Sequence, residues 1–301
     1  MNTGDTAPPS ATGEHRIRMT EQEAMSNLHT VLNLCAAGEL RCSEETHRPS
    51  AATVAAVGST LAHGHFYLDD PIASFAWPLT IQAGGLATIE SGRLRLTPKG
   101  RTALRRPTAE AISPLWRRWL THAVIDEFSR IEQIKGQRAH NVLTSARTRR
   151  QTVAAALASC PPGEWIGMDS LFTAMRRKGM SPNVARSERA LWKLYLVDPQ
   201  YGSLGYDGYH RWEILEGRYT MAVLFEYAGT LGLLDLDHLH PTGARSDFHA
   251  NWGGDDLDAL SRYDGLQAIR LTALSCPARC GPSSTTSPAE PPSSPTTATP
   301  G

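Results

Sequence analysis

The feature that most constrains the fold is a pair of short alternating runs, residues 86–89 and 94–97, within the stretch GGLATIESGRLRLTPKGRTAL. Apolar and polar residues alternate in both runs, which is typical of strands that bury one face. Ser91 and Gly92 between the runs are residue types that favour a hairpin turn. Pro98, Lys99 and Gly100 follow directly and lead into a helical pattern. The sequence therefore predicts a small antiparallel hairpin followed by a helix.

Three helical segments precede this hairpin. The first begins at Thr20, where TEQE matches a capping box with Glu23, and it ends at Gly38. The second covers residues 48–64 and starts with a proline and a serine. The third covers residues 69–85, and Pro78 is expected to bend or break it. Three helices followed by a hairpin is the order of elements in a winged helix.

The stretch that ends the third helix and forms the hairpin resembles the wing of many bacterial winged-helix proteins. In that family a Gly-Leu strand is followed by a Leu-Thr-x-x-Gly-Arg strand end and a closing helix, and this chain has Gly85-Leu86 and Leu96-Thr97 with Gly100-Arg101 at those places. The likeness extends over roughly a quarter of the chain. The whole chain also resembles uncharacterised two-unit winged-helix-like proteins of GC-rich bacteria, a likeness that implies no particular activity. The resemblance to the winged-helix family implies DNA binding and transcription regulation.

The second half of the chain repeats the order of elements. Helices are expected at 149–160, 165–179, 181–196 and 210–232, and strands at 233–239 and 263–274, with an inserted loop at 199–212. Residues 109–148 are expected to form a helical connector, in which Trp116 and Trp119 belong to the core. The predicted fold is mainly α with small β-hairpins: two winged-helix-like units, 20–108 and 149–275, joined by a packing helix.

Both ends of the chain are expected to be disordered. Residues 1–19 lie before the capping box, and Met19 is an alternative start to Met1. Residues 276–301 are rich in Pro, Ser and Thr and lack the apolar residues of a core, which leaves open a natural linker, a truncation or a frame error. A cytoplasmic protein without a membrane span is expected, because neither a secretory signal nor eighteen consecutive apolar residues are found.

Charge is unevenly distributed although the formal net charge is zero. Residues 91–120 hold eight basic side chains against Glu110 alone, whereas residues 20–90 carry eight acidic and two basic ones. A basic middle between acidic ends favours either a surface that faces an anion such as double-stranded DNA or charge pairing within the molecule. In the hairpin and the helix after it, the predicted phosphate contacts are Arg93, Arg95, Lys99 and Arg101.

Base contacts are expected in the second unit. On the predicted helix 181–196, Asn183, Arg186 and Lys193 share one face while apolar residues share the other, as a recognition helix requires. Arg176, Arg177 and Lys178 end the preceding helix, where they serve either as DNA contacts or as cations at a helix C-terminus. The third helix of the first unit offers only Ser74, Thr80 and Gln82 for base contacts.

Two alternatives to DNA binding remain open. A protein-interaction module would expose Phe75 and Trp77 as a docking patch. A metal-dependent hydrolase would use the polar cluster between residues 235 and 256, although its spacing matches no metal signature. No cofactor is expected and catalysis is disfavoured, because neither GxSxG, HExxH nor CxxC occurs. The members of that cluster are Asp235, Asp237, His238, His240, Asp247, His249, Asp255 and Asp256.

Overall fold

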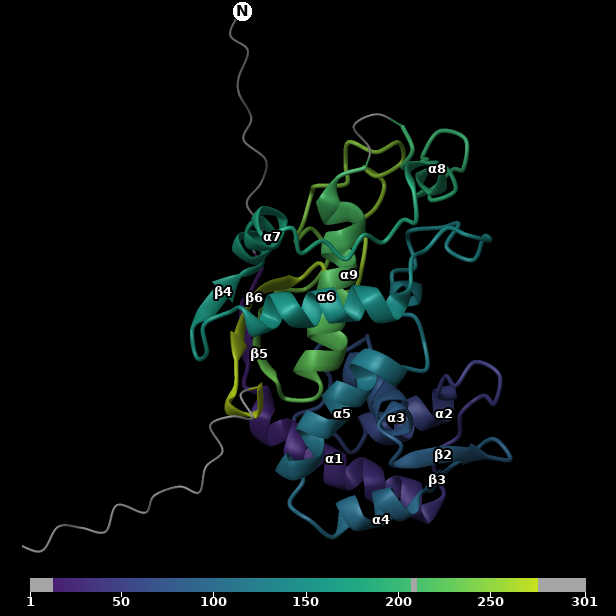
Figure 1. The fold of residues 1–301 in the computed structure, drawn as a ribbon, viewed down its shortest axis with the longest axis vertical. Helices are drawn as coiled ribbons and strands as arrows, with labels where there is room; N and C mark the ends of the chain where they lie inside the picture. Colours follow the sequence, from purple (N-terminus) through teal and green to yellow (C-terminus); the bar gives the residue numbers. More distant parts are fainter. Residues whose placement is uncertain (1–12, 207–209, 276–301) are drawn as a thin grey trace, which may run out of the picture.

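The predicted hairpin is present in the computed structural model, which describes residues 13–206 and 210–275 (Figure 1). Strands β2 (Ala87–Glu90) and β3 (Arg93–Leu96) pair antiparallel, with Glu90 opposite Arg93. Ser91 and Gly92 form the two-residue turn and both have positive φ, 50° and 71°. This geometry is typical of the turn that matches the twist of a hairpin. Residues 40–42 extend the sheet through a bridge between Arg41 and Arg93.

The lower half of the molecule in Figure 1 contains this hairpin, which lies at its edge, and four helices. They are α1 (Thr20–Ala37), α2 (Ala51–Gly58), α3 (Ile72–Ala83) and α4 (Pro98–Leu104). The Thr97 side chain caps α4 by accepting the amide of Gly100 at 3.0 Å. Pro78 lies inside α3 and does not end it.

The upper half is built on a four-stranded antiparallel sheet of order β1-β5-β6-β4. Its strands are β1 (Arg16–Arg18), β4 (Trp165–Gly167), β5 (Leu234–His238) and β6 (Leu266–Leu271). Its helices are α6 (Ala146–Ala158), α7 (Met168–Arg177), the short α8 (Glu188–Leu191) and a long helix over residues 213–229. We call this long helix, which includes α9 (Arg218–Ala222), the central helix. The two strands predicted at the C-terminal end of the chain are confirmed as β5 and β6.

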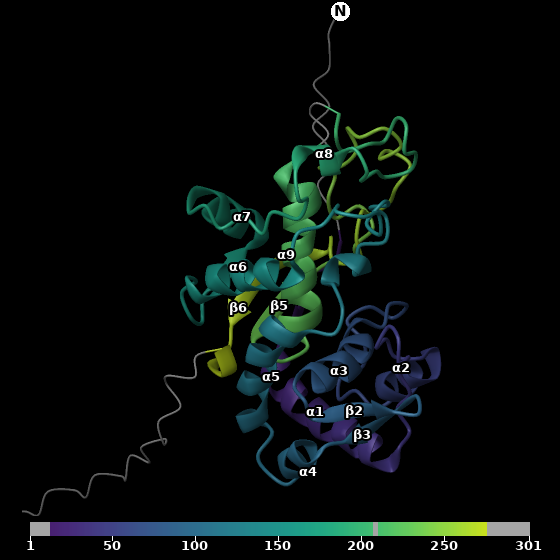
Figure 2. The ribbon, with the colours of Figure 1, turned by 45° about the vertical axis from the view of Figure 1, so that its right-hand side comes forward.

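Helix α5 (Ala109–His122) connects the halves (Figure 2). It packs on α3 below and on α6 above. Trp119 is fully buried, as predicted, and Trp116 packs beside it. The helical prediction for the connector is wrong for residues 123–145, which leave α5 and form only a short 3-10 turn at Glu127–Arg130 before α6 begins. One apolar core runs from Leu28 in α1 to Ile269 in β6 and includes residues of both halves.

Two other local predictions, the capping box and the disordered N-terminal tail at residues 16–18, are wrong because residues of β5 bind these segments instead. Thr20 does not cap α1: its hydroxyl donates to the carbonyl of Leu234 at 2.6 Å, and Glu23 binds Arg18 instead of closing a capping box. Residues 16–18, placed in a disordered tail, form strand β1 beside β5. Residues 1–12 and 276–301 of the predicted tails lie outside the described residues.

The predicted helix 181–196 is wrong as well, since only Glu188–Leu191 is helical. Its backbone groups bind residues 135–144 instead. The amide of Thr144 donates to Val184 at 3.0 Å, and that of Arg186 donates to Val142 at 2.8 Å. Bonds between segments that are distant in sequence have replaced the helical bonds that the local pattern favoured.

The most enclosed helix of the lower half is α3. All of its residues are buried except Phe75 and Gln82, and these two are half-buried. Helices α2 and α5 and the central helix cover its surface. A helix buried in this way has no free face with which it could enter the major groove of DNA.

Candidate nucleic-acid interface

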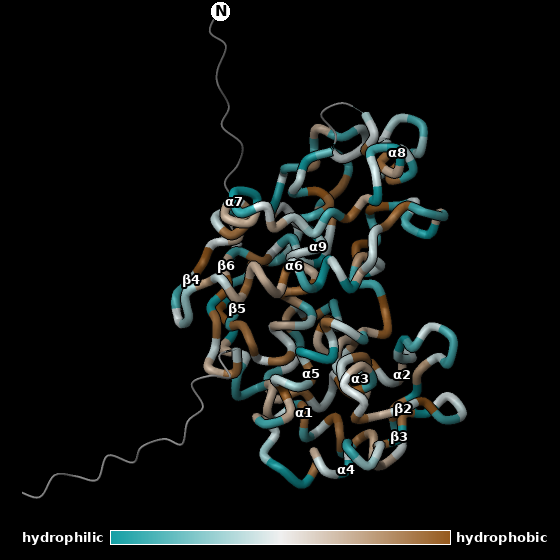
Figure 3. Tube along the Cα trace, viewed as in Figure 1, coloured by the Kyte–Doolittle hydropathy of each residue, from teal (hydrophilic) through white to brown (hydrophobic). Residues whose placement is uncertain are grey.

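The exposed cations of the lower half follow one continuous stretch of chain through β3, α4 and α5. We call them the basic strip. Figure 3 shows the turn between α4 and α5 as a strongly hydrophilic segment near the bottom of the molecule. Most members are exposed, and Arg93 is half-buried. The basic strip consists of Arg93, Arg95, Lys99, Arg101, Arg105, Arg106, Arg117 and Arg118.

Backbone carbonyls hold three of these side chains without neutralising their charge. Arg93 donates to the carbonyl of Gly38 at 2.8 Å, and Arg101 donates to that of Leu96 at 2.8 Å. Lys99 donates to the carbonyl of Gly84 at 3.0 Å. These neutral acceptors orient the cationic groups, which keep further donors for an anion.

No member of the basic strip forms an ion pair with a carboxylate of the described residues. Buried arginines elsewhere do form ion pairs: Arg130 pairs with Glu226, and Arg218 pairs with Asp264. Intramolecular pairing, the alternative reading of the basic middle, does not neutralise the strip. Its positive charge is available to an external anion.

Helix α4 brings strip residues together around two surface cavities. Arg95 and Arg101 line one of them with Glu90, and Lys99 and Arg106 line the other with Glu110. The strip therefore places cations on both sides of α4 rather than in a single row.

The side chains considered for base contact or docking on α3 are internal. Trp77 is fully buried, and Phe75 is half-buried beneath the guanidinium of Arg130, 3.8 Å from the ring centroid. The predicted Phe75 and Trp77 docking patch is therefore wrong. Ser74 and Thr80 are buried, and Gln82 donates to the carbonyl of His47 at 3.1 Å.

The predicted recognition face of the second unit does not form, because its residues lie on an irregular segment rather than on one helix. Asn183 has a left-handed backbone with φ of 38°, and its carbonyl accepts the hydroxyl of Thr144 at 2.7 Å. Arg186 donates to the side chain of Asn141 at 2.9 Å, and Lys193 donates to the carbonyl of His140 at 3.1 Å. All three remain exposed but bind residues 140–144 rather than sharing a helical face.

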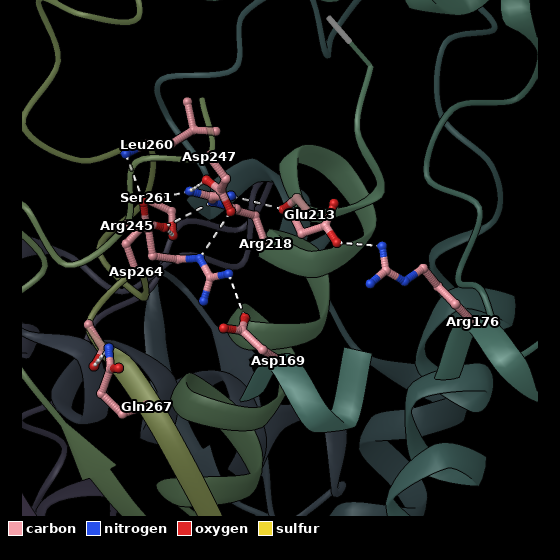
Figure 4. A network of polar contacts seen from close by, with 11 residues as sticks. Asp169, Arg176, Glu213, Arg218, Arg245, Asp247, Leu260, Ser261, Asp264 and Gln267 are labelled. Atoms are coloured by element: carbon pink, nitrogen blue, oxygen red, sulfur yellow. Dashed lines mark hydrogen bonds and ion pairs between the residues drawn. The ribbon is translucent and has the colours of Figure 1, made fainter. Parts of the chain in front are cut away.

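The cations at the end of α7 are separated by their partners. Arg176 pairs with Glu213 at 2.6 Å (Figure 4), and Lys178 donates to Ser159 at 3.2 Å. Arg177 is exposed, without an ion pair to any described residue. This arrangement resembles the cationic end of a helix more than a binding surface.

The acidic and histidine cluster at residues 235–256 is divided among separate contacts. Asp247 joins Arg218 at 2.6 Å and Arg245 at 3.1 Å, and Arg245 also reaches Asp169 at 2.8 Å (Figure 4). Burial alone would raise the pKa of Asp247, but the two guanidinium groups lower it. A carboxylate bound in this way is an ion-pair partner rather than a general base.

The other members of the cluster lie apart. Asp235 pairs with Arg270 at 2.7 Å, and Asp237 contacts His15 at 2.9 Å. His238 is 1% exposed, and burial lowers its pKa to about 4. Within residues 13–206 and 210–275, no three His, Cys, Asp or Glu side chains are grouped so that they would hold a metal ion. The remaining members, all exposed, are His240, His249, Asp255 and Asp256.

Sequence reasoning missed the charges inside the central helix. Glu216, Arg218 and Glu226 are buried there, although the segment reads as a long apolar helix. Glu226 accepts hydrogen bonds from Arg130 and from the hydroxyls of Tyr227 and Tyr263. The sequence did contain a signal for these ion pairs, namely three charged residues within an apolar run. Charged residues that are buried with such a run require partners.

No family model, no curated protein and no solved structure matches this chain. In the described part of the chain, every helix is too short or too polar to cross a membrane.

Proposed function

We propose that this protein binds double-stranded DNA by its phosphate backbone, as a DNA-associated regulatory protein without catalytic activity. The observation that carries the proposal is the basic strip, whose eight cations have no carboxylate partner among the described residues. Arg and Lys side chains on a protein surface bind phosphates and release the counterions of DNA. Arg95 and Arg101 on one side of α4, and Lys99 and Arg106 on the other, supply two groups of such contacts.

The order of elements, from which we propose a winged-helix relationship, supports this assignment. In the lower half the order is α1, the bridge segment 40–42, α2, α3, β2 and β3, and in the upper half it is α6, β4, α7, the short α8, the central helix, β5 and β6. Apart from the additional α8, each half has the order helix, strand, helix, helix, strand, strand. The basic strip begins in β3, which is the returning strand of the wing in this scheme.

Burial of α3 argues for backbone contact rather than base readout. Sequence is read mainly by side chains that enter the major groove, and α3 has no free face for this. The expected binding is strongly dependent on salt and only weakly dependent on sequence.

The test is the binding of the purified chain to mixed-sequence double-stranded DNA across a salt series. The variant Arg95→Ala/Arg101→Ala/Arg105→Ala/Arg117→Ala removes four exposed strip cations. The logarithm of the binding constant falls with the logarithm of salt by about 0.9 per phosphate contact, so the variant is expected to reduce this slope by about 3 to 4.

A matched control removes four exposed cations elsewhere: Arg138→Ala/Arg147→Ala/Arg177→Ala/Arg211→Ala. Because both variants change the net charge equally, loss of binding in the strip variant alone places the contact at the strip. Equal loss in both would reject a localised site. Absence of binding by the wild-type chain at low salt would reject DNA binding altogether.

A further inference from the structure

The surface between α4 and α5 contains a pocket of about 250 Å³ with an apolar floor. Leu86 and Leu115, both 2% exposed, form its base with Gly84. The base is closely packed, because a Cβ on Gly84 would lie 2.1 Å from Leu115. The walls come from α4, the turn after it and α5, and they include Ala103, Pro107, Ala111 and Pro114.

Three charged side chains, Lys99, Arg106 and Glu110, also line this pocket, and we call them its rim. Lys99 is held across the base by its 3.0 Å bond to the carbonyl of Gly84. The guanidinium of Arg106 has no hydrogen-bond or ion-pair partner among the described residues. Glu110 is the one acidic group in the lining, so the rim carries a net positive charge.

We infer that this pocket binds a small organic anion with an apolar body, such as an aromatic or branched aliphatic carboxylate. Concave sites with an apolar lining and a few polar groups are typical of small-molecule binding sites. The apolar body would replace water over Leu86, Ala111 and Leu115, and the carboxylate would pair with Lys99 and Arg106. A neutral ligand of the same shape would leave Lys99 and Arg106 without an anionic partner.

Occupancy of the pocket also regulates the basic strip, a step that rests on the proposed function. Lys99 and Arg106 belong both to the pocket and to the strip, so a bound carboxylate offsets positive charge that would otherwise meet DNA phosphates. A ligand of this class therefore weakens DNA binding through direct competition for the same cations.

The probe is 2-naphthoate, with the neutral 2-naphthamide as its control, measured by isothermal titration calorimetry on the full chain. The carboxylate is expected to bind about tenfold more tightly than the amide, as charged hydrogen bonds at a partly exposed site allow. Lys99→Met/Arg106→Met should abolish this preference. Arg101→Met, which removes a strip cation on the other side of α4, should leave it unchanged.

Glu110→Gln separates ligand recognition from a structural effect. Removing the like charge from the rim is expected to tighten naphthoate binding several-fold, whereas a damaged fold would weaken it. Ala111→Phe should block both probes by filling the pocket. Equal binding of naphthoate and naphthamide, or unchanged binding in Ala111→Phe, would overturn the inferred site.

DNA titrations with saturating naphthoate then test the regulatory step. The wild-type salt slope is expected to fall by about 1, and that of Lys99→Met/Arg106→Met should not respond to the ligand. If naphthoate binds but DNA does not, the pocket stands and the proposed function fails. If DNA binds but naphthoate does not, the proposed function stands and the pocket assignment fails. If both bind and naphthoate leaves the slope unchanged, the regulatory step is wrong.

Discussion

Trp119 of α5 stacks on Tyr227 of the central helix, with ring centroids 4.1 Å apart and planes 18° apart. Both rings are fully buried and form a small cluster with Ala76, Leu79 and Ala83 of α3. This contact joins the connector, the central helix and the most enclosed helix of the lower half. The pair therefore closes the side of α3 that would otherwise be open.

Replacing Trp119 with alanine is expected to destabilise the protein by about 3 to 5 kcal/mol, since the substitution leaves a large cavity in a buried cluster. Urea denaturation followed by circular dichroism measures the change. The matched control is Trp165→Ala, because Trp165 is 39% exposed and much of its surface is already in water. Equal losses in the two variants would show that the Trp119 contact is not structurally special.

The buried pair of Arg130 and Glu226 gives a second prediction. The side chains are 7% and 0% exposed, and the Arg130 Nε lies 3.0 Å from the carboxylate. Arg130→Met leaves a buried carboxylate without its counter-charge and is expected to cost about 3 to 5 kcal/mol. Arg130→Met/Glu226→Gln should be more stable than Arg130→Met in urea denaturation, because the amide keeps a hydrogen-bond acceptor and removes the charge. The reverse order would contradict this account.

His238 predicts a loss of stability in acid. Its pKa is lowered to about 4 by burial, while Arg16 and Arg18 also disfavour its charged form and Asp237 opposes them. The unfolded chain binds a proton near the ordinary pKa of about 6.5, so it holds more protons than the folded chain between pH 6.5 and 4. Above this pH window the histidine does not change the free energy of unfolding. As the pH drops to 5, its protonation in the unfolded chain lowers the free energy of unfolding by about 2 kcal/mol.

Urea midpoints at pH 7.5 and pH 5.0 measure this dependence. In His238→Phe the ring remains beside Phe225, and the part of the pH dependence that comes from His238 should disappear. An unchanged difference between the two pH values in this variant would assign the acid sensitivity to other groups.

A substitution at Gly136 tests how tightly residues 135–144 pack against residues 181–196. Its φ is +81°, and a Cβ there would lie 1.7 Å from the carbonyl oxygen of Lys193. Gly163 provides the control, because its φ is +77° and nothing lies within 4 Å of a Cβ. Gly163→Ala should lower the free energy of unfolding by about 1 to 2 kcal/mol, which is the strain of a left-handed alanine. Gly136→Ala should lower it further, because the neighbouring backbone must also move. Equal midpoints in urea would show that the segments separate without cost.

Local sequence patterns determined the elements whose stabilising contacts are close in the chain. The alternating runs with Ser91 and Gly92 specify the β2–β3 hairpin, because turn geometry and strand period act over a few residues. The apolar stripe of α5 likewise specifies the burial of Trp119. The uneven charge of residues 91–120 also identified the cations of the basic strip before their surroundings were known.

Tertiary structure decided everything that depends on a partner distant in sequence. Residues 181–196 have a helical pattern, but pairing with residues 135–144 satisfies their backbone groups in another way. Residues 16–18 become a strand because β5 offers an edge. The burial of α3, the lack of ion pairs between the strip and the described carboxylates, and the pocket between α4 and α5 all depend on how the helices pack. Packing of this kind brings together residues whose spacing in the chain carries no trace of their contact.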